Sequence, residues 1–250
     1  MASSVTDTTT ERFWEVDALR GIAIIMMILY HIAFDLTYLH IADIPLHSLS
    51  WQLFLFPIGV LFLLLVGISL SLSYSRIKNS SSPTQLRLKF LLRGARILGL
   101  GFLITLATWI YPHEGFIVFG VLHCIGLSII LVFPLLDKQW ENLFLGFVCV
   151  TLGLYIRTLT IQTDWFVWLG LTSPTFSSLD YFPLLPWCGI VLLGLFLGNT
   201  LYKDYRRRFN LWDLSDSLLI RFLAVLGKHS LLIYLLHQPI ILGVLYLLRI

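Results

Sequence analysis

Seven apolar runs along this chain each have about the length of a helix that crosses a lipid bilayer. Such a helix needs about 20 apolar residues, because the hydrocarbon core is about 30 Å thick. Residues 218–226 are apolar apart from Arg221 but too short to cross, and either lie on the inner surface or extend the last helix. We therefore predict an all-α fold, a polytopic integral membrane helical bundle with about seven transmembrane helices, at roughly residues 18–39, 51–74, 90–110, 116–136, 141–158, 181–202 and 229–249.

The composition agrees with a membrane fold and excludes an ordinary soluble domain. Hydrophobic residues make up 58% of the 250 residues and charged residues 12%, whereas a soluble domain has about 25% charged residues. Residues 1–11 are mostly polar, and no small-residue cleavage site follows the first apolar run. We expect a disordered cytosolic tail at residues 1–11, then an uncleaved signal-anchor helix, within one transmembrane domain over residues 12–250.

The basic residues indicate how the helices are oriented. Lys and Arg are enriched in the cytoplasmic loops of multi-pass proteins. With a cytosolic N-terminus, alternating spans place 15 of the 17 Lys and Arg residues inside and only Arg157 and Arg249 outside. This asymmetry predicts a cytosolic N-terminus. It also accounts for the net charge of +3 without a nucleic-acid partner.

The cysteines and short motifs give no support for a metal, a disulfide or a nucleotide-binding loop. Cys124, Cys149 and Cys188 all fall in predicted spans, so we expect free thiols that pack among apolar side chains. The sequence has no C-x-x-C, H-E-x-x-H, GxGxxG or P-loop pattern. We therefore expect no metal.

The first span carries ionisable residues on a single helix face. Asp17, Arg20, His31 and Asp35 lie on this face, and the opposite face is apolar. Ionisable groups are costly in hydrocarbon and indicate a functional site by default, although a polar stripe that only packs and hydrogen-bonds is the alternative. We expect Asp17 and Arg20 to form an ion pair where the helix begins. His31, about 16 Å beyond Arg20, should lie in the outer half of the membrane.

Further histidines are predicted near the outer side. His123 falls in the fourth span, and His40, His47 and His113 fall in outer loops. Histidine suits general acid–base chemistry because its pKa lies near neutrality. The loop histidines are equally compatible with solvated residues, and His123 with a hydrogen-bonded packing residue.

A basic pair lies where the third span is expected to begin on the inner side. Arg93 and Arg96 flank Gly94, and small residues allow helices to approach each other closely. Guanidinium groups in such a place can hold phosphates through paired hydrogen bonds. The alternative is that they only set the topology or contact anionic lipid.

The last helix has a polar face next to a proline. Ser230, Tyr234 and His237 share this face, with Gln238 beside it. Pro239 should kink the helix and free a carbonyl one turn earlier. We expect His237 to hydrogen-bond within the bundle rather than to react.

Four motifs occur in an order that resembles a known family of membrane enzymes. The first is Glu-Val-Asp-Ala-Leu-Arg-Gly-Ile-Ala at 15–23, followed by His31 and Asp35, and the others lie at 119–128, 180–187 and 227–239. Together they resemble the small prokaryotic branch of the family built around the heparan-α-glucosaminide N-acetyltransferase catalytic domain. The first motif is also similar to the broader membrane acyltransferases that modify cell-surface sugars.

The resemblance implies an integral-membrane acyltransferase of a prokaryotic plasma membrane. It implies that acetyl-CoA or another acyl-CoA is taken from the cytosolic side as co-substrate. An amine or hydroxyl of a sugar or other envelope acceptor then receives the acyl group on the outer side. Arg93 and Arg96 become candidates to contact the CoA phosphates. The acceptor, the acyl chain length and a homo-oligomeric state stay open.

Two histidines compete for the role of the base that removes the acceptor's proton. His31 is our choice, with Asp35 one turn away to orient the ring and stabilise the imidazolium. In the lysosomal member of the family the key histidine lies in the loop after the first helix, which makes His47 the rival. His123 can assist either of them.

The same residues also permit two functions that involve no catalysis. A proton-coupled transporter would use the intramembrane His and Asp as a proton relay. A non-enzymatic subunit of envelope assembly would need neither group to titrate. Acyl-CoA binding distinguishes the enzyme from both alternatives.

Overall fold

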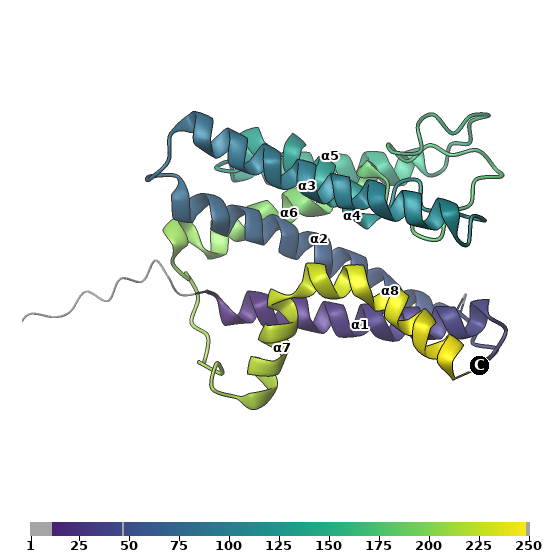
Figure 1. Cartoon of the computed structure of the whole chain (residues 1–250). Helices are drawn as coiled ribbons and strands as arrows, with labels where there is room; N and C mark the ends of the chain where they lie inside the picture. Colours follow the sequence, from purple (N-terminus) through teal and green to yellow (C-terminus); the bar gives the residue numbers. More distant parts are fainter. Residues whose placement is uncertain (1–11, 47, 249–250) are drawn as a thin grey trace, which may run out of the picture. The chain divides into compact units, whose positions relative to one another are not determined.

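A computed structural model provides the structure of the chain and describes residues 12–46 and 48–248 (Figure 1). The predicted tail at 1–11 and His47 lie outside these residues. The described part forms eight α-helices and two short 3₁₀ helices, and it contains no strand. The elements are α1 (Trp14–Tyr38), α2 (Leu49–Ile77), α3 (Pro83–Ile110), α4 (Val121–Leu131), η1 (Phe133–Leu135), α5 (Trp140–Ile156), α6 (Leu184–Leu201), η2 (Lys203–Tyr205), α7 (Leu218–Lys228) and α8 (Ser230–Leu247).

Five helices of the described chain are long and apolar enough to cross a membrane, namely α1, α2, α3, α6 and α8. The apolar helices α4 and α5 have only 11 and 17 residues. At 1.5 Å per residue they are about 17 and 26 Å long, shorter than a hydrocarbon core of about 30 Å. The chain is an all-helical integral membrane protein, while the count of seven spans and the orientation of the N-terminus stay predictions.

The fourth expected span, residues 116–136, is much shorter in the structure. Residues before Gly120 lie in a loop, where the Phe119 carbonyl accepts a hydrogen bond from the Phe182 N–H. At the other end Pro134 lies in η1, and its missing N–H prevents the α-helix from continuing. The apolar run is therefore longer than the helix, because apolar residues continue into the loop and the 3₁₀ turn.

The chain forms two compact units, with boundaries between Leu65 and Val66 inside α2 and between Asn210 and Leu211. The first unit combines α1, the first part of α2, α7 and α8, and the second contains the helices in between. Both ends of the described chain thus contribute to the first unit. The expectation of one domain over residues 12–250 stays a prediction.

In the first unit α7 and α8 lie against α1 (Figure 1). A side chain at Gly21 would overlap the backbone of Leu223, and one at Gly227 would overlap the backbone of Asp17. These glycines let α7 and α1 touch backbone to backbone. Further along α1, Ile24, Met27 and neighbouring side chains form an apolar cluster with α2 and α8. The close contact fixes the register of α1 against the C-terminal helices.

In the second unit α3 packs on α4, and α6 packs on α4 and α5. Gly194 and Gly198 of α6 lie against Gly67 and Ser71 of α2. Each helix here carries two small residues four positions apart, which allows close approach. The cysteines also agree with the prediction, since all three are free thiols.

Hydrogen bonds join the loop before α4 to the loop before α6. Backbone N–H groups of Leu179 and Phe182 donate to the carbonyls of Gly115 and Phe119. The Asp180 carboxylate accepts from the Val121 N–H at the start of α4, at 2.9 Å. These bonds satisfy backbone groups that no helix pairs and hold the beginning of α4 in place.

Candidate functional site

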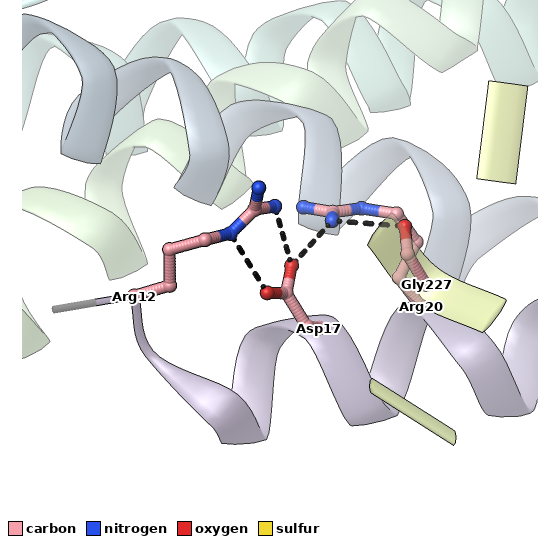
Figure 2. Close-up of polar contacts among 4 residues, drawn as sticks. All are labelled: Arg12, Asp17, Arg20 and Gly227. Carbon is pink, nitrogen blue, oxygen red and sulfur yellow. Dashed lines mark hydrogen bonds and ion pairs between the residues drawn. The ribbon is translucent and has the colours of Figure 1, made fainter. Parts of the chain in front are cut away.

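The first polar group on α1 is an ion-pair cluster centred on Asp17 (Figure 2). Arg12 donates to both carboxylate oxygens at 3.0 Å, and Arg20 donates to Oδ1 at 2.9 Å. The Asp17 side chain is only 4% exposed, whereas that of Arg12 is 55% exposed. The ion pair expected between Asp17 and Arg20 is therefore present, and Arg12 is an additional partner.

This cluster also links α1 to α7. Arg20 donates a second hydrogen bond, at 3.3 Å, to the carbonyl of Gly227 near the end of α7 (Figure 2). Gly227 in turn lies against the Asp17 backbone. Both oxygens of Asp17 are thus bonded, and the cluster joins two helices of the first unit, as a structural element does.

The second polar group on α1 contains His31 and Asp35. His31 Nδ1 lies 2.9 Å from the carbonyl oxygen of Met27, one turn earlier. A carbonyl only accepts hydrogen bonds, so we assign the proton of the neutral ring to Nδ1. The lone pair of His31 then belongs to Nε2, which no described residue hydrogen-bonds. The Met27 carbonyl of the same helix therefore orients the ring. We had expected Asp35 to do so.

Asp35 is instead bonded to α8. Gln238 Nε2 donates to Asp35 Oδ1 at 2.8 Å. One turn earlier on α1, the His31 ring packs edge to face against His237, with ring centroids 4.5 Å apart. His237 Nδ1 lies 2.6 Å from the Tyr234 carbonyl oxygen and therefore also carries the ring proton. We call these four side chains, His31, Asp35, His237 and Gln238, the α1–α8 cluster.

Three polar atoms of the α1–α8 cluster are buried without a hydrogen-bond partner in the described chain: Asp35 Oδ2, His237 Nε2 and Gln238 Oε1. Asp35 is 2% exposed and His237 8% exposed. A buried polar atom without a partner costs about 1–3 kcal/mol, and most are paired in folded proteins. These three atoms therefore indicate a place where a further group binds.

His123 has a different environment in the second unit. Its Nδ1 accepts from the Gly120 N–H at 3.2 Å, so the proton of the neutral ring is on Nε2. Nε2 lies 3.3 Å from Thr105 Oγ1, and Thr105 donates its own hydrogen to the Ile117 carbonyl at 2.7 Å. The ring also packs against Gly101 of α3. Both ring nitrogens are bonded, as in the packing alternative.

The basic pair lies in the middle of α3 and not at its beginning. α3 begins at Pro83, ahead of the expected span, because Ser82 and Gln85 form a capping box there. Arg93 donates to Ser73 Oγ at 3.3 Å, and Arg96 is exposed. Gly94 lies against Gly126 of α4, as expected for a small residue at a helix contact. Both guanidinium groups could still contribute to phosphate binding.

Sequence reasoning placed His237 in a packing role and did not connect Gln238 with Asp35. The available signal was the polar pair directly before Pro239, because proline removes an N–H donor from the helix and leaves the Leu235 carbonyl without its helical partner. His47, the rival base, lies outside the described residues. His40 lies in the loop after α1 and belongs to no cluster described here.

The family described as Heparan-alpha-glucosaminide N-acetyltransferase, catalytic, matches residues 12–239. A search of curated proteins and a search of solved structures each found no significant match. The family match covers all helices from α1 through the first half of α8, including both polar groups of α1. The chain therefore belongs to the family of heparan-α-glucosaminide N-acetyltransferase catalytic domains.

Proposed function

We propose that this protein transfers an acetyl or other acyl group from acyl-CoA on the cytosolic side to an amine or hydroxyl of a sugar or related envelope acceptor on the outer side. Membership in a family of membrane acetyltransferases supports the reaction class. The basic-residue asymmetry supports a cytosolic N-terminus. Labelling of an engineered cysteine at Ser48 from the outer side tests this orientation, and labelling only from the cytosol would contradict it.

The observation that carries the proposal is the contact of His31 Nδ1 with the Met27 carbonyl, which leaves the lone pair of the neutral ring on Nε2. In the proposed step, His31 Nε2 takes a proton from the acceptor while the acceptor's lone pair forms a bond to the thioester carbonyl carbon. The carbon–sulfur bond then breaks, and the leaving CoA thiolate takes the proton from the His31 imidazolium. The Met27 carbonyl, hydrogen-bonded to Nδ1–H, holds the ring and stabilises the imidazolium.

Transfer of labelled acetyl from acetyl-CoA to a sugar acceptor tests the choice of base. His31→Ala should reduce turnover by roughly 10²–10⁴-fold, because general base catalysis is lost. His40→Ala, in an outer loop, is the matched control. Full activity in His31→Ala together with its loss in His47→Ala would assign the base to His47. Full activity in both variants would refute the mechanism.

We further propose that Arg93 and Arg96 contact the CoA phosphates from the cytosolic side. CoA is polyanionic, and guanidinium groups bind phosphate with charge-assisted hydrogen bonds. Loss of such a bond costs about 1.5–3 kcal/mol, so Arg93→Ala and Arg96→Ala should each weaken acyl-CoA binding by roughly 10- to 100-fold. Arg87→Ala, on the same helix, removes an equal charge as a control. Binding that stays unchanged in both test variants, or falls equally in the control, would leave these residues a role in topology only.

A further inference from the structure

The α1–α8 cluster contains three unpaired polar atoms besides the proposed base His31. Asp35 Oδ2, Gln238 Oε1 and His237 Nε2 are all buried and unpaired within the described chain. The amide oxygen of Gln238 only accepts, His237 Nε2 accepts because Nδ1 carries the ring proton, and Asp35 Oδ2 accepts when the carboxylate is ionised. One water molecule has only two hydrogens, so three acceptors need either several waters or one ligand with several donors. A ligand rich in N–H or O–H groups fits the cluster.

The register of the helices places these acceptors next to the proposed base. The backbones of Gly21 and Gly227 meet, and ten residues beyond each of them lie His31 and His237, whose rings are in contact. Gln238, the next residue on α8, reaches Asp35 one turn further along α1. The two helices thus bring one Nε2 lone pair on α1 and three unpaired acceptors together at a single junction.

We propose that His237 and Gln238, with Asp35, form the binding site for the acyl acceptor and require a hydrogen-bond donor beside the acceptor's nucleophilic group. This inference rests on the proposed function. His31 Nε2 takes the proton of the nucleophile, and the three buried acceptors bind the neighbouring N–H or O–H groups of the same molecule. A site with buried acceptors rejects an analogue without the matching donors, because the acceptors are then left unpaired. The ligand class is a polyol or amino-polyol with adjacent donors, and not a simple amine or alcohol.

The test compares two acceptors that differ by one hydroxyl, glucosamine and its 3-deoxy analogue, with labelled acetyl-CoA as donor. In the wild type we expect kcat/KM to fall by roughly 10- to 100-fold for the 3-deoxy sugar, the equivalent of one buried acceptor left unpaired. His237→Asn removes the acceptor Nε2, and Gln238→Met removes the acceptor Oε1 together with the N–H donor to Asp35. They should raise the KM for glucosamine by a similar factor and reduce the preference for it over the 3-deoxy sugar.

Two controls separate acceptor binding from packing. His237→Gln places an amide oxygen near the position of Nε2 and should restore much of the preference for glucosamine, which a loss of packing would not do. His229→Asn, an exposed histidine at the beginning of α8, should leave KM and preference unchanged. Acetyl-CoA binding measured on every variant shows that each one is folded.

The outcomes distinguish this inference from the function on which it rests. Equal kcat/KM for both sugars in the wild type, or unchanged KM and preference in His237→Asn and Gln238→Met, would overturn the acceptor site and leave the acyltransferase assignment intact. Absence of transfer to either sugar by wild-type protein that binds acetyl-CoA would contradict the proposed function itself. A raised KM, a reduced preference and rescue by His237→Gln together support the site.

Discussion

His123 of the second unit and the pair His31 and His237 of the first unit have opposite hydrogen-bonding states. His123 accepts at Nδ1 and lies within hydrogen-bonding distance of Thr105 at Nε2, so its ring has no free nitrogen. His31 and His237 donate from Nδ1 to carbonyls of their own helices and keep a lone pair on Nε2. A base needs such a lone pair, and a residue that only supports the fold does not. The comparison supports the proposal that the chemistry belongs to α1 and α8 and that His123 has a structural role.

The two aspartates of α1, Asp17 and Asp35, differ in the same way. Asp17 is bonded through both oxygens, to Arg12 and to Arg20, whereas Asp35 is bonded through one oxygen and leaves the other unpaired. A fully bonded buried group contributes to the fold, and a half-bonded one is available to a ligand. One helix therefore carries a structural site at its beginning and a candidate binding site further along.

Breaking the Asp17 cluster should have the largest effect on stability. Asp17→Ala removes the carboxylate that pairs with the mostly buried Arg20 guanidinium, and a buried ion pair that loses one member costs about 3–5 kcal/mol. Arg12→Ala should cost less than about 1 kcal/mol, because Arg12 is largely exposed. Unfolding titrations in mixed detergent micelles measure both changes.

Asp35→Asn provides the matched comparison for the other carboxylate. The asparagine oxygen still accepts from Gln238, so the free energy of unfolding should change by no more than about 1 kcal/mol. Equal destabilisation by Asp17→Ala and Asp35→Asn would mean that the distinction between the two carboxylates is wrong.

Removing the ring nitrogens of His123 should have an effect on stability between those of Asp17→Ala and Asp35→Asn. His123→Phe keeps an aromatic ring beside Phe102 and Phe119 but leaves the Gly120 N–H without its acceptor. The free energy of unfolding should fall by about 1–3 kcal/mol. Thr105→Val removes the other partner and should cost less, because His123 retains its bond to Gly120. Unchanged stability in His123→Phe would contradict the structural role.

The smallest expected effect on stability comes from an exposed ion pair at the end of α2. Lys78 Nζ lies 2.8 Å from Asp204 Oδ1, and its hydrogen bond and positive charge lower the pKa of Asp204. A lowered pKa in the folded state stabilises the protein above the ordinary aspartate pKa of about 3.9, and this contribution disappears as the pH falls through the lowered value. Lys78→Ala should therefore destabilise the protein slightly at neutral pH and not at all in strong acid. A stability difference that grows on acidification would contradict this sign.

Hydropathy predicted the positions of the helices well, because apolar length is a local property of the chain. It failed where local chemistry ends a helix, as at Pro134, and where polar residues continue one, as at Ser82 to Arg87. The Asp17–Arg20 ion pair was predictable because the two residues lie one turn apart on one helix. The bond from Gln238 to Asp35 was not, because it depends on the register between helices more than 200 positions apart in the chain.

The most direct test of this assignment is a single assay of acetyl transfer by His31→Ala and His123→Phe, with rates expressed per folded molecule that binds acetyl-CoA. We predict that His31→Ala loses roughly 10²–10⁴-fold in turnover. His123→Phe should keep the wild-type rate within a few-fold, despite its lower stability. A large loss of turnover in folded His123→Phe, together with a near-normal rate in His31→Ala, would contradict the assignment of the chemistry to α1 and α8.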